Sequence, residues 1–221
     1  MLLAKPSLNP FWQGIGAQLR NPSGLRGRLA GTAMARANAK PNRLALAALG
    51  LRDGETLLEL GCGSGRALYE SLRSSRLAKA IGLDWSETML AQASRRNRRA
   101  LEAGRCVLVR AEFAHVPVAG EIADAVLAVN VVYFMNSSAA VREARRVLRP
   151  DGRIVIYATD RSAMRHWPFA GRHTHRLYNA NRLTALLVDA GFSADRIRIE
   201  SVNAGFGVAG LLAIAHKGIT D

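Results

Sequence analysis

The stretch LLELGCGSG, residues 57–65, constrains the fold more than any other part of the chain. An apolar run interrupted only by Glu59 ends at three glycines on alternate positions, Gly61, Gly63 and Gly65. Glycines after a strand permit a tight turn and let a ligand lie against bare backbone, beside the N-terminus of the next helix. The pattern predicts a buried strand followed by a ligand-binding turn, and a purely structural glycine turn is the alternative.

Short apolar runs alternate with helix-like segments from residue 56 onward. Because the runs are apolar almost throughout, we expect strands that are covered on both faces, as in parallel sheets. Ser86 is placed to cap the second helix and Gly104 to end it. The expected strands are 56–60, 79–84, 106–110, 123–130 and 153–159, and the expected helices between them are 66–73, 87–103 and 138–148.

The last quarter of the chain has a different rhythm. A helix over 181–190 is expected to stop at Gly191, and two apolar runs, 196–202 and 210–217, follow with only a glycine-containing link between them. Two strands so close in sequence most simply form an antiparallel hairpin. The chain therefore predicts an α/β fold with a doubly wound, mostly parallel sheet, right-handed crossovers and helices on both faces.

Spacing limits the ligand that the glycine turn can hold. A dinucleotide fingerprint needs G-x-G-x-x-G, but Arg66 stands where the third glycine belongs, and no phosphate-binding G-x-x-x-x-G-K-[ST] occurs. Asp84 is expected at the tip of the neighbouring strand, where an acid can accept both hydroxyls of a ribose. A capping or surface role for Asp84 is the alternative.

Five motifs in order resemble the class I S-adenosylmethionine-dependent methyltransferases, particularly small bacterial proteins of the type 11 and type 25 kind. The resemblance covers about residues 45–217 and rests on LLELGCGSG, GLDWSETML, AEFAHVPV, ADAVLAVNVVYF and EARRVLRPDGRIVI. It implies a seven-stranded sheet of order 3-2-1-4-5-7-6 with the last strand antiparallel. It also implies S-adenosylmethionine as the cofactor that donates the methyl group.

The resemblance assigns contacts with this cofactor to individual residues. The glycines pass under its methionine part, Asp84 takes the ribose position and Trp85 lies beside the adenine. Alignment on Pro117 puts Glu112 where the family's Asp receives the adenine amino group, although Glu adds one methylene to the reach. The complete set implied to bind the cofactor is Glu59, Gly61, Gly63, Gly65, Asp84, Trp85, Met89, Glu112, Phe113 and Asn130.

The acceptor is expected to bind where the end of the fourth strand, the insertion 160–178 and the N-terminal segment meet. The fourth strand does not end in the N-P-P-Y sequence of methyltransferases that modify DNA adenines or glutamine amides, which argues against those acceptors. Tyr133 and His166 are the candidate catalytic residues, and Tyr133 is alternatively a wall. A base is needed only where the acceptor must lose a proton. No metal is expected, because no Cys or paired carboxylate joins His173 and His175 locally.

Residues 1–44 are expected to form an N-terminal extension, and residues 45–221 the Rossmann-like methyltransferase domain. Glycines punctuate the first 31 residues, and a helix is expected over 32–49. Three roles remain open for the extension: a lid that excludes water, a basic amphipathic segment on an anionic membrane, or a packing helix. Arg36 and Arg43 are candidates to meet the cofactor carboxylate.

The formal net charge of +14 raises the question of a polyanionic partner. Because 27 of the 31 basic residues are Arg and no aromatic-basic RNA-binding signature occurs, we expect a solvated basic surface and no nucleic acid. No apolar run reaches the ~20 residues of a membrane span, and we expect a cytoplasmic protein. The favoured function is methylation of a small-molecule acceptor; the alternatives are a membrane-surface lipid or quinone methyltransferase and a nucleic-acid-binding module.

Overall fold

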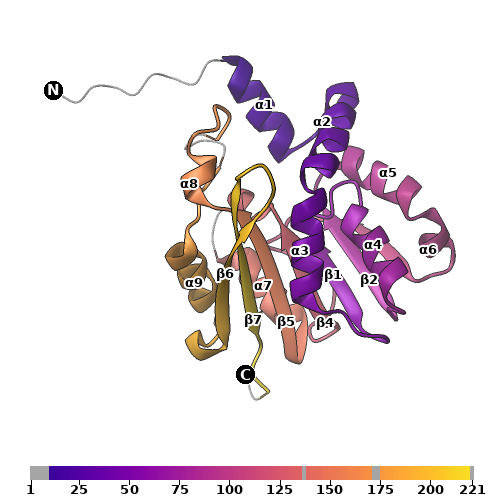
Figure 1. The fold of residues 1–221 in the computed structure, drawn as a ribbon. Coiled ribbons are helices and arrows are strands. Elements are labelled where there is room, and N and C mark those ends of the chain that lie inside the picture. The colour runs from indigo at the N-terminus through magenta and orange to yellow at the C-terminus, as the bar shows by residue number, and fades with distance from the viewer. Residues whose placement is uncertain (1–9, 136–137, 171–174, 220–221) are drawn as a thin grey trace.

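The computed structural model describes residues 10–135, 138–170 and 175–219. Its centre is one seven-stranded sheet of order β3-β2-β1-β4-β5-β7-β6 (Figure 1). β7 runs antiparallel to both of its neighbours, and the remaining paired strands are parallel. The predicted order and the predicted final hairpin are confirmed. The strands are β1 (Thr56–Leu60), β2 (Lys79–Asp84), β3 (Cys106–Arg110), β4 (Ala123–Val129), β5 (Leu148–Thr159), β6 (Ile197–Asn203) and β7 (Ala209–His216).

The fifth strand is longer than the sequence indicated. β5 begins at Leu148, which pairs with Ala123, whereas Arg153 pairs with Ala125, so residues 149–152 form an irregularity within the strand. Asp151 has a φ of 60°, a left-handed conformation that bends the backbone there. The predicted strand over 153–159 is therefore the regular part of a longer element.

Alternate side chains of each strand enter two separate cores. Leu58 and Leu60 of β1 pack with α7 (Ala139–Val147) and α9 (Ala180–Asp189) on one face. Leu57 packs with α3 (Ala39–Leu49) and α4 (Arg66–Ser74) on the other. This division follows from the two-residue period of a strand, and it explains why β1 is buried at every position. The expected helices on both faces are confirmed.

The helix expected over 87–103 is divided. Ser86 caps α5 (Glu87–Arg96), its Oγ accepting a hydrogen bond of 3.3 Å from the backbone N–H of Met89, as predicted. Asn97 then separates α5 from α6 (Arg98–Glu102). The buried Asn97 amide donates to the carbonyls of Gly65 and Ala93, both at 3.0 Å. The break therefore ties α5 to the turn that follows β1.

The N-terminal segment is more helical than its glycines suggested. It forms α1 (Pro10–Arg20), α2 (Gly24–Ala37) and α3, so the helix expected over 32–49 is divided at Asn38. Gly31 allows close packing, because a Cβ there would lie 2.5 Å from Cε of Met89 in α5. The expected domain boundary between residues 44 and 45 falls inside α3, whose Ala45 and Leu49 belong to the core.

The remaining helical elements lie near the ends of the strands. They are α8 (Arg161–Met164) and the short 3₁₀ turns η1 (Val132–Phe134) and η2 (Ala194–Arg196). In Figure 1, α1, α2 and α8 lie at the same end of the sheet as the loop between β6 and β7. Within the part of the chain that the structure describes, no helix is long and apolar enough to cross a membrane.

Candidate functional site

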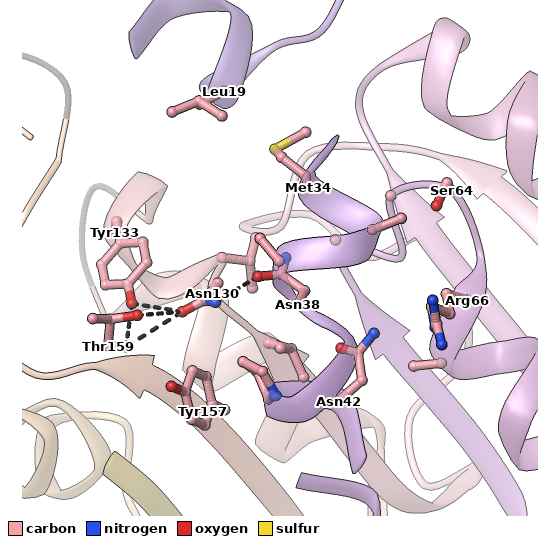
Figure 2. A pocket seen from close by; sticks show the side chains of 18 of the residues that line it. Leu19, Met34, Asn38, Asn42, Ser64, Arg66, Asn130, Tyr133, Tyr157 and Thr159 are labelled. Atoms are coloured by element: carbon pink, nitrogen blue, oxygen red, sulfur yellow. Dashed lines mark hydrogen bonds between the residues drawn. The ribbon is translucent and has the colours of Figure 1, made fainter. Parts of the chain in front are cut away.

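A cavity of about 730 Å³ opens at the carboxyl ends of β1, β2, β4 and β5. This edge is where open α/β sheets bind their ligands, and the volume lies in the range of small-molecule sites. α1, α2 and α3 close one side of it; Figure 2 shows Leu19 and Met34 facing Tyr133 and Thr159 across the space. The cavity joins the glycine turn to the region expected to bind an acceptor.

The glycine turn forms a bare wall of this cavity. Gly61 has a φ of 67° and Gly63 a φ of 51°, a region that side chains with a Cβ rarely adopt. A Cβ on Gly61 would lie 2.5 Å from Cγ2 of Val131, so glycine is required there for packing. At Gly63 nothing lies within 4 Å of the Cβ position, which leaves open space over the backbone. The turn thus offers the surface that the sequence predicted.

Asp84 holds this turn in place from the end of β2. Its Oδ2 accepts from the N–H of Gly63 and its Oδ1 from the N–H of Ser86, both at 2.9 Å. Burial raises the pKa of Asp84 above its ordinary value, while these backbone hydrogen bonds oppose that rise. Each carboxylate oxygen keeps a second lone pair, so Asp84 can still accept hydrogen bonds from a diol.

Glu59 lines the same end of the cavity and is fully buried. Its Oε2 has no hydrogen-bond partner in the described structure. Desolvation raises the pKa of Glu59 well above its ordinary value, and the nearby Asp84 carboxylate raises it further. An orphaned carboxylate oxygen in a cavity wall is a site that a cationic group can complete.

Two aromatic rings form the next part of the wall. Trp85 and Phe113 stack with their ring centroids 5.3 Å apart. Trp85 Nε1 donates to the carbonyl of Arg20 at 2.9 Å, and the Arg20 guanidinium lies 5.6 Å from the ring centroid. A planar base between the two rings would need them about 7 Å apart, twice a carbon–carbon contact. At 5.3 Å the two rings therefore leave no room for a base between them.

Asn130 links the strand ends to the N-terminal helices. It ends β4 with a φ of 54°, and its Nδ2 donates to Oδ1 of Asn38 at 2.8 Å (Figure 2). The Tyr133 hydroxyl donates to Oδ1 of Asn130 at 2.7 Å and accepts from the N–H of Thr159. Burial raises the pKa of Tyr133 above its ordinary value, so the phenol stays protonated at neutral pH. This geometry suits positioning better than proton abstraction.

The far end of the cavity is aromatic. The ring of His175 lies 4.9 Å from that of Phe134 and 5.9 Å from that of Phe169, measured between centroids. Trp167 extends the series, 5.4 Å from Phe169. His175 is buried, its Nδ1 has no partner among the described residues, and burial lowers its pKa to about 4. The imidazole is therefore uncharged at neutral pH, and this end of the cavity is apolar.

Three of the expected site residues lie outside the cavity. Glu112 and His166 are exposed, and His166 accepts a hydrogen bond from Nε of Arg165 at 3.0 Å. Gly65 packs against α5, where a Cβ would lie 2.8 Å from that of Ala93. Glu112 and His166 therefore do not line the cavity, and their expected contacts with ligands stay predictions. The other expected residues do line the cavity: Glu59, Gly61, Gly63, Asp84, Trp85, Met89, Phe113, Asn130 and Tyr133.

The site also contains residues that the sequence did not single out. Asn38 gave no signal, because an isolated Asn between two helices is typical of a surface turn. His175 belonged to the insertion 160–178, but nothing in that sequence separates a buried His from an exposed one. His173, which together with His175 is not expected to hold a metal, lies outside the described residues.

Solved structures share this fold and define its class. A chain in the complex between the Haloferax volcanii Trm112 methyltransferase activator and a methyltransferase matches with a TM-score of 0.75 at 18% identity, covering 96% of this chain and 100% of that chain. Haemonchus contortus phosphoethanolamine N-methyltransferase 2 matches with a TM-score of 0.73 at 14% identity, covering 94% and 60%. The fold is therefore the Rossmann-like methyltransferase fold.

Sequence comparisons find similar proteins of the same class. The model described as "Methyltransferase domain" matches residues 58–156. A Mycobacterium tuberculosis protein named "Probable S-adenosylmethionine-dependent methyltransferase" is 32% identical over 140 residues, which cover 62% of this chain and 48% of that protein. The Bacillus subtilis methyltransferase YdaC is 28% identical over 136 residues, covering 61% and 73%. The chain is therefore similar to S-adenosylmethionine-dependent methyltransferases, and its residues 58–156 match the methyltransferase domain, in agreement with the resemblance that the motifs indicated.

The chain spans about half the length of the Mycobacterium tuberculosis relatives that it matches. The family's methyl donor is S-adenosylmethionine. The residues of the cavity fit this donor: the open backbone at Gly63 accommodates a close approach, and the orphaned Oε2 of Glu59 suits an ammonium group.

Proposed function

We propose that this protein transfers a methyl group from S-adenosylmethionine to a small-molecule acceptor. The single observation that carries the proposal is the continuity of the cavity. One end presents the glycine turn with Glu59 and Asp84, and the other presents the aromatic residues around His175. A donor and an acceptor can therefore lie in line within one enclosed volume, and such positioning supplies much of the rate of a displacement reaction.

Each residue at the donor end has a separate task in this proposal. Glu59 ionises against the donor's ammonium group, which supplies the partner that its Oε2 lacks. Asp84 accepts the ribose hydroxyls through the lone pairs that Gly63 and Ser86 leave free. The stacked pair of Trp85 and Phe113 contacts the adenine by one side. These contacts fix the direction in which the reactive methyl group points.

The chain's residues position and shield the reaction. When bound, S-adenosylmethionine supplies a methyl group on a sulfonium, a good leaving group. Tyr133, held by Asn130 and Thr159, orients the acceptor as a wall and hydrogen-bonding group, and it keeps its proton. α1 and α2 cover the cavity, which supports the proposed role of the N-terminal segment as a lid that excludes water. We give His166 no catalytic role, because it is exposed.

Calorimetric titration combined with a transfer assay tests this function. We expect saturable binding of S-adenosylmethionine and of S-adenosylhomocysteine, and label transfer from the methyl-labelled donor to a component of a metabolite extract. NAD should bind much more weakly, because Arg66 occupies the position of the third fingerprint glycine. Tighter binding of NAD, or no labelled product from any extract fraction, would contradict the proposal.

A membrane-surface lipid or quinone acceptor is the second candidate, and Phe206 favours it. This residue is fully exposed at the tip of the β6–β7 loop, has a φ of 51° and lines the cavity mouth. An exposed phenyl ring beside basic side chains suits contact with an anionic bilayer. Flotation with phosphatidylglycerol vesicles tests the idea, with Phe206→Ser as the variant. Flotation that is absent, or equal for both proteins, would remove this candidate.

A further inference from the structure

Three cationic side chains in the cavity wall have no ion-pair partner in the described structure. Arg36 ends α2, and Lys40 and Arg43 lie on α3; all three are exposed, and no carboxylate pairs with them. The other two cations of the wall are engaged. Arg66 pairs with Glu70 at 2.8 Å, and Arg20 lies over the Trp85 ring. The wall therefore carries positive charge that the protein itself does not neutralise.

The carboxylates of the cavity do not balance these cations. Only Glu59 and Asp84 line it among the described residues, and both are buried at the donor end. Each has a raised pKa, which reflects the cost of ionising it there. The proposed donor adds to the imbalance, because its sulfonium and ammonium groups outweigh its one carboxylate. A loaded cavity therefore stays positive and favours an anion as the second ligand.

The aromatic end of the cavity provides a surface on which the apolar part of an acceptor can pack. The His175 ring contacts both Phe134 and Phe169, with centroid distances of 4.9 and 5.9 Å. Aromatic boxes also bind organic cations through cation–π contacts. No carboxylate lines this end within the described residues, and His175 is uncharged. A cationic acceptor would therefore find no negative charge to offset its repulsion from the unpaired Lys40 and Arg43. The charge balance of the cavity therefore favours an anionic acceptor over a cationic one.

Lys40 is the cation best placed to meet such an acceptor. A Cβ on Gly205, in the loop beside Phe206, would lie 3.7 Å from Cδ of Lys40, so this side chain crosses toward the mouth of the cavity. Two residues earlier, Asn38 bonds Asn130, which in turn bonds Tyr133. Lys40 therefore lies just after the residue whose hydrogen bonds connect the start of α3 to Tyr133.

We propose that the acceptor is a small organic acid with a flat apolar body. The body lies among Phe134, Phe169 and His175, and its carboxylate faces Lys40 at the mouth. This inference rests on the proposed methyltransferase function, because it places the nucleophile of the acid beside the donor. It names the acceptor's class: an aromatic or unsaturated carboxylate, in preference to an amine or a neutral molecule.

Three matched probes test the charge requirement: 3-phenylpropanoate, 3-phenylpropanamide and 3-phenylpropylamine. Each is titrated calorimetrically into the full chain saturated with S-adenosylhomocysteine. We expect the acid to bind at least about tenfold more tightly than the amide, since a hydrogen bond to a charged partner has about that effect. The amine should bind most weakly. High salt should reduce the preference for the acid, because the three cations are exposed.

Substitutions at two lysines identify the residue responsible. Lys40→Gln should lower the acid-to-amide ratio about tenfold and change the affinity for S-adenosylhomocysteine by less than about twofold. Lys79→Gln removes the same charge from an exposed position outside the cavity, at the start of β2, and should leave the ratio unchanged. Phe134→Ala should weaken the acid and the amide alike, because both share the phenyl ring.

Each contrary result has a separate meaning. Equal binding of acid and amide, tightest binding of the amine, or failure of all three probes to saturate would overturn the acceptor class. An identical response to Lys40→Gln and Lys79→Gln would overturn the role of Lys40. Failure to bind S-adenosylhomocysteine in the first titration would refute the proposed function itself, before any acceptor probe is added.

Discussion

Replacing Glu59 by glutamine removes a buried ionisable group with little change of shape. This carboxyl is buried, its Oε2 lacks a partner among the described residues and its pKa is raised well above the ordinary value. Protonated Glu and neutral Gln are both uncharged and nearly the same shape, so burying either should cost the fold about the same. The difference between them arises from ionisation alone.

The size of that difference follows from proton linkage. An unfolded Glu ionises near pH 4.3, and each unit by which the folded pKa exceeds this value contributes about 1.4 kcal/mol. The cost of Glu59 at pH 7 therefore has an upper limit of about 4 kcal/mol. For a chain of this length 1 kcal/mol corresponds to about 2–4 °C in Tm. We expect Glu59→Gln to raise the Tm of the empty protein at pH 7 by about 3–10 °C.

The sign of the pH dependence is fixed by the direction of the shift. Because the folded pKa of Glu59 is raised, its contribution to stability is complete below the unfolded pKa and is lost as the pH rises toward the folded pKa. The two proteins should melt together near pH 4, and Glu59→Gln should gain its advantage as the pH increases toward 7. Glu102→Gln, at an exposed position, should show no such divergence.

Binding should change in the opposite direction. Without a carboxylate to meet the donor's ammonium group, Glu59→Gln should bind S-adenosylhomocysteine about ten- to a hundredfold more weakly. Differential scanning fluorimetry from pH 4 to pH 8 and calorimetry at pH 7 measure the two effects. A Tm difference that is independent of pH, or a destabilised variant with unchanged affinity, would refute this account of Glu59.

Three further predictions concern other parts of the site. Asp84→Asn should weaken S-adenosylhomocysteine binding about tenfold, while Glu112→Ala should have less effect, because Glu112 is exposed outside the cavity; calorimetry compares them, and equal losses would contradict the assignment. Cofactor binding should change the tryptophan fluorescence of the protein but not that of Trp85→Phe, since adenine is expected against the Trp85 ring; a variant that responds like the unsubstituted protein would exclude that contact. Deleting residues 1–31 should leave cooperative thermal unfolding but reduce methyl transfer at least tenfold, since the segment covers the cavity; full activity would exclude the lid.

The sheet was predictable because local rules and tertiary structure agree along most of it. Apolar runs such as 56–60 are buried on both faces, and the hairpin of β6 and β7 follows from two runs with a short link. Ser86 caps its helix because Ser is a strong capping residue at that position. The positions of Gly61 and Asp84 beside the cavity were equally predictable from the sequence, since both lie where a strand ends.

The acceptor end was not predictable, because contacts distant in sequence decide it. His166 and His175 belong to one insertion with similar composition, yet tertiary packing buries only His175. Asn38 joins the site through a hydrogen bond to Asn130 from a helix junction that has no sequence signal. Gly31 is one of the glycines that punctuate the first 31 residues, and it provides close packing against Met89. Residue propensity alone does not show whether a glycine serves flexibility or close packing.

A crystal structure of the full chain with S-adenosylhomocysteine tests the central claim most directly. The ammonium nitrogen should lie within hydrogen-bonding distance of Oε2 of Glu59, the ribose hydroxyls should bond Asp84, and the sulfur should face the space beside Tyr133 and His175. A molecule bound outside the cavity, or one whose sulfur points away from the aromatic end, would contradict the proposal that donor and acceptor share this cavity.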